Sequence, residues 1–361
     1  MLPQPVLKQV QAELLDYKDT GCSVMELSHR SKEFEAVIAE AEADLRSILS
    51  IPDNYKVLFM QGGATAQFAG IVMNLGHDKP LDYIVSGTWS EKALQEAQRL
   101  GAAVNVVVNS KALKHTGRFP SIEEWKFSED ASYVYYCDNE TVHGVEFQQS
   151  FVDAFPHKNV PVVCDMSSNI LSRPFDVSKF GLVYGGVQKN VGPAGVTIVI
   201  IREDLINCPK QNIPLMLDYK VFADNKSLYN TPPTFTIYVC GLVLKWILGL
   251  GGIHAIEKMN NSKAGLLYEA IDSMKCFQCP VSRELRSRMN VTFRLINKTG
   301  EADAELEKRF VSEADKMGLV QLAGHRSVGG IRASLYNALS LEAAEALVAF
   351  MKSFASNNEL M

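Results

Sequence analysis

Four features of the sequence could do chemistry, and each follows a short apolar run. They are the turn Gly62-Gly63-Ala64-Thr65, the ring of Trp89, the carboxylate of Asp165 and the amine of Lys189. Small residues at a turn before a helix let backbone N–H groups approach a phosphate, and an indole ring can stack on another planar ring. A lysine amine can form an imine with a carbonyl group, and a carboxylate can pair with a protonated ring nitrogen.

Taken singly, each feature has an ordinary structural explanation. The turn could be a simple tight turn, Trp89 a core residue, Asp165 a turn cap and Lys189 a solvated surface residue. Together they are the parts that a pyridoxal 5'-phosphate site needs. The acid keeps the pyridine nitrogen protonated, and the displaced lysine moves a proton as a general base. The set therefore predicts a pyridoxal-phosphate enzyme.

A mainly parallel sheet must position these features. Short β-branched or aromatic runs alternate with helical stretches, and the runs cover residues 57–60, 83–85, 103–108, 133–137, 160–164, 182–184 and 196–201. Such alternation favours crossover connections and a sheet covered on both faces. Functional residues of such sheets gather just beyond the carboxyl ends of the strands. We expect a large α/β domain with a mainly parallel, seven-stranded type of sheet.

The last third of the chain has a different pattern. A helical stretch over residues 235–275 is broken by glycines at 249–252. The expected elements that follow are strands at 290–295, 319–322 and 330–335, and helices at 302–317 and 341–354. This order predicts a smaller C-terminal α+β domain. We place the boundary at the glycine break, so that residues 1–250 form the large domain and residues 251–361 the small one.

Composition excludes several classes of function. Lys and Arg number 36 and Asp and Glu 41, so the net charge of −5 gives no basic excess for nucleic acid. No stretch has the length and apolarity of a membrane span. The seven cysteines are odd in number, and the Cys276–Cys279 pair lacks zinc partners. We expect a cytoplasmic protein that acts on small molecules, with no metal, nucleic-acid or membrane partner.

Longer motifs carry a resemblance to a known family. They are Ser28-His29-Arg30, Asn139-Glu140-Thr141-Val142-His143-Gly144, Cys164-Asp165-Met166-Ser167-Ser168-Asn169-Ile170, Gly185-Gly186-Val187-Gln188-Lys189-Asn190, Tyr229-Asn230-Thr231-Pro232-Pro233 and Gly324-His325-Arg326-Ser327-Val328-Gly329-Gly330-Ile331-Arg332. The chain resembles the phosphoserine aminotransferase family, within the class V aminotransferases of fold type I. The similarity covers essentially the whole chain. It implies the fold-type I architecture and pyridoxal 5'-phosphate as cofactor.

The resemblance also implies how the cofactor is held. Lys189 would carry it as an imine, and Asp165 would pair with the pyridine nitrogen. Trp89 would stack on the ring, and Thr141 would bond its phenolic oxygen. The phosphate would be bound by Ala64, Thr65, Gln188 and, from a second subunit, Asn230 and Thr231. A homodimer with shared active sites follows from that last implication.

The implied reaction transfers the amino group of glutamate to 3-phosphohydroxypyruvate, giving phosphoserine and 2-oxoglutarate in serine biosynthesis. Phosphohydroxythreonine is a second candidate substrate. Arg332 would bind the α-carboxylate, because arginine forks suit carboxylates and phosphates alike. The far anionic end would be bound by His29, Arg30, His325 and Arg326, some of them across the dimer.

Three alternatives stay open. Another class V activity, such as alanine–glyoxylate transamination or cysteine desulfuration, would keep the cofactor, although the setting of Cys276 and Cys279 does not resemble a desulfurase loop. The family segment Asn-Phe-Gly-Pro-Gly-Pro is missing before Leu2-Pro3, so a catalytically impaired short form or a silent scaffold is also considered. Thr65 stands where relatives often have arginine or cysteine, so substrate phosphate binding would rest more on Arg30 and Arg326.

Overall fold

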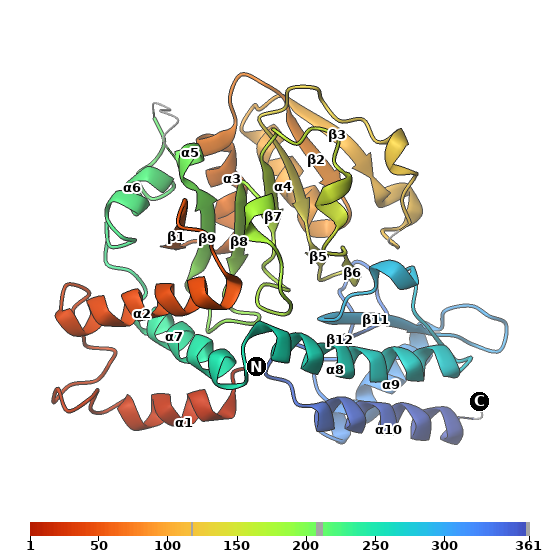
Figure 1. Ribbon diagram of the computed structural model, residues 1–361. Coiled ribbons are helices and arrows are strands. Elements are labelled where there is room, and N and C mark those ends of the chain that lie inside the picture. Colours follow the sequence, from red (N-terminus) through yellow and green to blue (C-terminus); the bar gives the residue numbers. More distant parts are fainter. Residues whose placement is uncertain (117, 207–211, 359–361) are drawn as a thin grey trace.

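A computed structural model describes residues 1–116, 118–206 and 212–358 of the chain. Cys208, one of the seven cysteines, lies outside the described residues. A large sheet with helices on both faces occupies one part of the molecule, and a three-stranded sheet with the helices α8 (Ile253–Ser273), α9 (Ala304–Lys316) and α10 (Leu341–Asn357) occupies the other (Figure 1).

The large sheet has seven strands in the order β1-β9-β8-β7-β4-β2-β3. Their bounds are β1 (Tyr55–Met60), β2 (Leu81–Val85), β3 (Val104–Asn109), β4 (Tyr133–Cys137), β7 (Val162–Asp165), β8 (Leu182–Gly186) and β9 (Thr197–Arg202). Only β9 runs antiparallel to its neighbours β1 and β8. The expected α/β class and mainly parallel seven-stranded sheet are therefore confirmed. The short pair β5 (Asn139–Glu140) and β6 (Val145–Glu146) follows β4.

Two helical layers bury the two faces of this sheet. One apolar cluster joins the sheet to α2 (Lys32–Leu49) and α7 (Thr234–Gly249), and α1 (Gln4–Glu13) packs beside α7. The other cluster joins it to α3 (Gly63–Leu75), α4 (Thr88–Arg99) and α6 (Tyr219–Asp224), while α5 (Glu203–Ile206) contacts β9. Because side chains alternate along a strand, neighbours such as Val163 and Cys164 enter opposite clusters.

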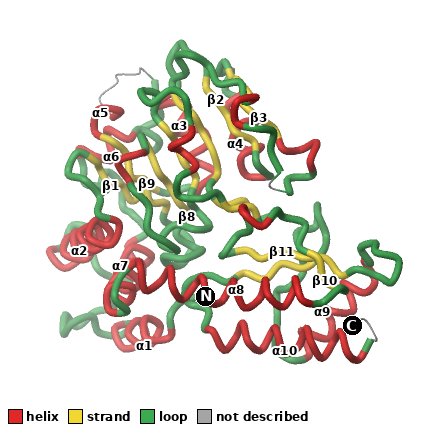
Figure 2. The backbone as a smooth tube through the Cα atoms, turned by 45° about the vertical axis from the view of Figure 1, so that its right-hand side comes forward, coloured by secondary structure: helices red, strands yellow, loops and turns green. Residues whose placement is uncertain are grey.

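The C-terminal part forms its own core. The sheet of β10 (Phe277–Gln278), β11 (Asn290–Leu295) and β12 (Ile331–Ser334) shares an apolar cluster with α8 (Ile253–Ser273), α9 (Ala304–Lys316) and α10 (Leu341–Asn357). Figure 2 shows these helices beside the small sheet, away from the large one. The division into residues 1–250 and 251–361 stays a prediction.

One predicted strand is wrong. Residues 319–322 form no strand, and the nearest pairing is an isolated bridge between Ala323 and Ile331. Gly318 has a φ of 81° and Gln321 a φ of 64°. The Leu319 N–H donates to the carbonyl of Ala314 in α9. The apolar run therefore closes the end of a helix, where left-handed residues turn the chain away from an extended path.

The glycine break separates two helices that meet at a steep angle. Gly251 and Gly252 have φ values of 102° and 80°, a conformation that side-chain-bearing residues rarely adopt. Within the described ranges no single helix has the length and apolarity to cross a membrane. Helices α7 and α8 reach that length and apolarity only when taken together, and the chain bends by 85° between them.

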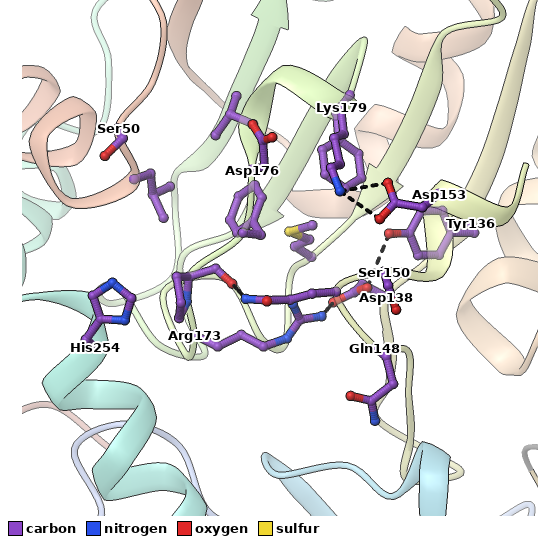
Figure 3. A pocket seen from close by; sticks show the side chains of 17 residues that line it. Ser50, Tyr136, Asp138, Gln148, Ser150, Asp153, Arg173, Asp176, Lys179 and His254 are labelled. Carbon is purple, nitrogen blue, oxygen red and sulfur yellow. Dashed lines mark hydrogen bonds and ion pairs between the residues drawn. The ribbon is translucent and has the colours of Figure 1, made fainter. Parts of the chain in front are cut away.

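A buried ion network links the large sheet to the C-terminal part. Arg173 donates to Asp138 at 2.7 Å and to Glu146 at 3.3 Å, and their side chains are at most 5% exposed. Glu146 also pairs with Arg288, which precedes β11, at 2.9 Å. Burial raises the pKa of Asp138 above its ordinary value, with Arg173 opposing the shift. Figure 3 shows Arg173 reaching Asp138, with the exposed Lys179–Asp153 pair nearby.

This network predicts a large stability difference between two matched substitutions. Arg173→Met leaves the buried Asp138 without its cation and Glu146 with Arg288 alone, so we expect the free energy of unfolding to fall by about 3–5 kcal/mol. Lys179→Met removes an exposed pair and should cost at most about 1 kcal/mol. Urea denaturation of both variants checks the difference, and equal losses would contradict a stabilising role for the buried network.

Candidate functional site

One edge of the large sheet collects the residues predicted to hold the cofactor. Because β9 is antiparallel to both neighbours, β1 runs parallel to β8 and its carboxyl end lies at the same edge. Ala64 and Thr65 follow β1, and Trp89 follows β2. Thr141 lies beyond β4, Asp165 ends β7, and Gln188 and Lys189 follow β8.

Asp165 is a buried carboxyl group that forms no ion pair with any of the described residues. Its side chain is 4% exposed. The backbone N–H of Ser167 donates to Oδ1 at 2.8 Å, and the hydroxyl of Tyr184 donates to Oδ2 at 3.0 Å. Burial raises its pKa above the ordinary value, while these hydrogen bonds oppose the shift. Within the described residues no cation pairs with it, so a protonated ring nitrogen would supply the missing charge.

Lys189 lies half-buried on the loop after β8. No carboxylate of the described residues forms an ion pair with it, and its Nζ lies 5.8 Å from the ring centroid of Tyr336. The next residue, Asn190, is buried, and its side chain donates to the carbonyl of Ile170 and accepts the N–H of Asn337. The loop that carries the amine is therefore held from both sides.

Trp89 and Thr141 lie at neighbouring strand ends. Trp89 is half-buried at the start of α4, and Nζ of Lys92 lies 4.6 Å from its ring centroid. Thr141 is 7% exposed. Glu140, the last residue of β5, was not predicted as functional, although it belongs to the motif that carries Thr141. Its carboxylate accepts the N–H of Trp89 at 2.9 Å.

The glycine turn after β1 leads into the start of α3, where an anion can bind to backbone N–H groups. Gly62 has a φ of 88°, and a Cβ there would lie 2.6 Å from that of Ala66. No side chain caps the start of α3. The first-turn N–H groups, where Ala64 and Thr65 lie, therefore lack intrahelical partners and favour a phosphate.

Two further residues predicted to bind the phosphate lie on another loop. Asn230 exchanges hydrogen bonds of 3.1 Å with Gln61, which precedes the turn in the same chain. Thr231 is exposed beside it, and Gln188 is exposed at the edge of the sheet. The contribution of Asn230 and Thr231 from a second subunit stays a prediction.

Arg332 lies in a cavity of about 370 Å³ between the two parts of the chain. Its Nε is buried and has no hydrogen-bond partner among the described residues. A buried guanidinium nitrogen without a partner suits an anionic ligand. Thr292 of β11 faces it across the strand pair and also lines the cavity.

Two histidines of this cavity were missed by the sequence reasoning. His115 and His143 line it, and their ring centroids are 4.6 Å apart. Nε2 of His143 lies 3.0 Å from Oγ1 of Thr88. Burial, with His115 and His325 adding to it, lowers the pKa of His143 to about 4. His143 therefore lines the pocket as a neutral polar group, and only its place in the Asn139–Gly144 motif could have signalled it.

The predicted residues for the far substrate end are not all brought together. His325 bonds Ser327 on the turn before β12, and Arg326 is exposed there. His29 is half-buried and Arg30 exposed on the connection between α1 and α2. Figures 1 and 2 place that connection on the opposite side of the molecule from the small sheet. Within one chain, His29 and Arg30 therefore do not join Arg332.

A larger cavity lies elsewhere. It measures about 610 Å³ and is lined by Tyr136, Arg173, Lys179 and His254 among others (Figure 3). None of the predicted site residues lines it. Its basic groups Arg173 and Lys179 are already paired with carboxylates. Cavity size alone therefore does not identify the functional site.

Comparison with known proteins places the chain in a family. Residues 1–347 match the family model described as Aminotransferase class-V. The chain is 52% identical over 357 residues to a phosphoserine aminotransferase of Laribacter hongkongensis, and this alignment covers 98% of this chain and 96% of that protein. It is also 52% identical to phosphoserine aminotransferase 1, chloroplastic, of Arabidopsis thaliana, over 98% of this chain and 80% of that protein.

Solved structures agree. The phosphoserine aminotransferase from Bacillus circulans subsp. alkalophilus superimposes with a TM-score of 0.93 at 46% identity, covering 99% of this chain and 96% of that one. A structure of "PLP bound phosphoserine aminotransferase" from Trichomonas vaginalis gives 0.91 at 43% identity, covering 98% and 97%. An alanine–glyoxylate aminotransferase from Nostoc shares only the fold, at 16% identity over 92% and 90%, with a TM-score of 0.71. As its motifs predicted, the chain belongs to the class-V aminotransferase family.

Proposed function

We propose that this class-V aminotransferase moves an amino group between glutamate and 3-phosphohydroxypyruvate, giving phosphoserine and 2-oxoglutarate. The observation that carries the proposal is that Asp165 and Lys189 lie at one edge of the sheet, in a chain that also holds Arg332, whose buried Nε has no hydrogen-bond partner among the described residues. The names of relatives about half identical over nearly the whole chain support the choice of substrates. Phosphohydroxythreonine remains a second candidate substrate.

The chemistry of the donor set fits pyridoxal 5'-phosphate. Lys189 would hold it covalently, and Asp165 would keep its ring nitrogen protonated. Trp89 would cover one ring face, Thr141 would bond the phenolic oxygen, and the first turn of α3 would bind the phosphate with Gln188, Asn230 and Thr231. The bound cofactor supplies an electron-withdrawing ring that makes the proton on the substrate Cα acidic.

The remaining steps belong to side chains of this protein. Arg332 binds the α-carboxylate of either substrate through its guanidinium fork. This contact would fix the orientation of the Cα–H bond, and the amine of the half-buried Lys189, once free, would take that proton and deliver it to the cofactor carbon from which the amine was displaced.

The far end of the substrate calls for cations that one chain does not assemble. We propose that His29 and Arg30 are contributed by a second subunit and act with His325 and Arg326 on the phosphate or the distal carboxylate. The protein would then be a homodimer with shared sites, working in the cytoplasm. The separation of the α1–α2 connection from β12 within one chain supports this arrangement (Figure 1).

A desulfurase reading is disfavoured by the described cysteines of the C-terminal part. Cys276 is buried and Cys279 is half-buried. Burial raises the pKa of both thiols above the ordinary value. Because the thiolate is the nucleophile, such cysteines are poorly suited to attack sulfur.

The first prediction concerns the covalent link. After borohydride treatment and denaturation, pyridoxal phosphate should stay on the parent protein and leave Lys189→Ala, which should also lose transamination. Lys220→Ala, an exposed lysine paired with Asp224 on α6, serves as the control and should retain the cofactor. Mass spectrometry of the denatured chains checks this, and a retained cofactor on Lys189→Ala would mean that another lysine forms the link.

The second prediction tests the shared site. Arg30→Ala should raise KM for phosphoserine about tenfold, the loss of roughly one charge-assisted contact, with cofactor content unchanged. Co-expressed Lys189→Ala and Arg30→Ala chains, purified as a mixed dimer with two tags, should regain activity because one of the two sites then has both residues intact. No recovery would place Arg30 and Lys189 in the same subunit or remove Arg30 from the site.

The third prediction concerns acid sensitivity. The native pKa of His143 of about 4 lies below the ordinary 6.5, so the folded state binds a proton less readily between these values. The stability that this group contributes is present above pH 6.5 and is lost as the pH falls toward 4. His143→Gln should therefore reduce the decline in unfolding free energy across this window. His254→Gln, an exposed control, should leave the decline unchanged, and equal declines in all three proteins would contradict the assignment.

A further inference from the structure

Glu140 lies between the two elements proposed to hold the cofactor ring. It directly precedes Thr141, and its side chain is fully buried at the start of α4. Oε2 accepts the N–H of Trp89 at 2.9 Å, and Oε1 accepts the N–H and the hydroxyl of Ser90 at 2.9 and 2.6 Å. One carboxylate therefore takes three donors from the turn that carries the indole.

These contacts replace the cap that this helix lacks. The first N–H groups of a helix have no intrahelical partner, and Gly87 at the N-cap position has no side chain to accept them. Glu140 accepts two of them although it lies about 50 residues away in the chain. A negative charge at a helix start is also favourable, and hydrogen bonds to a carboxylate are stronger than neutral ones.

The backbone before Trp89 is fixed by the same group of atoms. Oγ of Ser90 accepts the N–H of Ser86 at 2.9 Å and that of Gly87 at 3.0 Å. A Cβ on Gly87 would lie 2.5 Å from Cδ of Glu140. The carboxyl group thus packs directly on the strand-to-helix turn, and only glycine leaves room for it at this position.

We propose that Glu140 is a positioning residue, which fixes the indole of Trp89 relative to Thr141 so that both meet the same cofactor ring. The contacts belong to this chain alone, while the purpose assigned to them rests on the proposed function. A carboxylate that only capped α4 could come from any neighbouring segment. Glu140 instead directly precedes Thr141, the proposed ligand of the phenolic oxygen. A shift of Glu140 would therefore move both Thr141 and the turn that carries Trp89.

The test compares two Glu-to-Gln changes in protein whose only tryptophan is Trp89. The chain has three tryptophans, so Trp125→Phe and Trp246→Phe give this parent. Glu140→Gln keeps the volume but replaces an accepting oxygen by an NH₂ group that faces N–H donors. Glu91→Gln makes the same change one residue beyond Ser90, where the side chain pairs with Lys111 and not with the turn.

Without cofactor, Glu140→Gln should shift the Trp89 emission to longer wavelength and make it more open to acrylamide quenching than in the parent or Glu91→Gln. The affinity for pyridoxal phosphate should fall about tenfold, equivalent to about 1.4 kcal/mol, which is the size of one lost aromatic stacking contact. Emission and affinity equal to those of Glu91→Gln would overturn the proposal.

Ser90→Ala keeps both backbone hydrogen bonds to Glu140. It removes the hydroxyl, which donates to Glu140 and accepts the N–H groups of Ser86 and Gly87. If Glu140→Gln does not fold, this variant should show the same two changes at smaller size, and an unchanged Trp89 emission and affinity would overturn the proposal. The proposed function fails separately. A parent that binds no pyridoxal phosphate would refute that function, whereas the emission shift in cofactor-free protein would still support the positioning of Trp89 by Glu140.

Discussion

The carboxyl group of Asp165 is the constraint on which the site depends. Placing an unpaired charge in a protein interior is costly, and the usual remedies are a partner of opposite sign or loss of the charge. Among the described residues, the hydrogen-bond donors to Asp165 are neutral: the N–H of Ser167 and the hydroxyl of Tyr184, which is itself bonded to Tyr135 at 2.8 Å. These bonds fix the position of the carboxyl group, and a cationic partner would stabilise its charged form.

The sheet topology decides what else can meet that carboxyl group. The strand β1 pairs antiparallel with β9. If β9 ran parallel to β8 and this antiparallel pairing were kept, β1 would run antiparallel to β8, and the turn after β1 would lie at the opposite edge of the sheet. With β9 antiparallel, the first turn of α3 lies at the edge that also carries Asp165 and Lys189. The start of α3 and the carboxyl group of Asp165 at one edge suit the proposed cofactor, which carries both a phosphate and a ring nitrogen.

The sequence was most informative where local pattern and burial agree. The sequence predicts β4 and β11 at their observed bounds, and for β4 polar residues on both sides, Ser132 and Asp138, mark the ends of the apolar run. Residues 319–322 are equally apolar, yet they close α9, since left-handed residues and not hydrophobicity decide the path there. Helices α1 and α2 were not predicted, although Ser31 caps α2 in the way that serine commonly does.

The residues of the candidate site also differ in whether local sequence predicts them. Lys189 and Asp165 could be found because a residue after a buried strand must lie at the sheet edge. Glu140, His115 and His143 could not, because their roles depend on contacts with segments many residues away: α4 for Glu140 and the cavity beside Arg332 for the histidines. His29 and Arg30 depend on a second chain in the proposed dimer, which no pattern within one chain can place.

The two parts of the site must also keep a fixed distance, and buried polar contacts provide it. Asn337, just beyond β12, donates its N–H to Asn190 at 3.0 Å, and Lys263 of α8 donates to the carbonyls of Leu335 and Tyr336. All of these polar side chains are buried. The segment just beyond the strand that carries Arg332 is thereby tied to the residue after Lys189, which limits how far the proposed ligand of the α-carboxylate and the proposed general base can move apart. In the proposed reaction, a substrate whose carboxylate and Cα–H do not match that spacing would bind Arg332 and still not react, so the spacing itself would be a source of specificity.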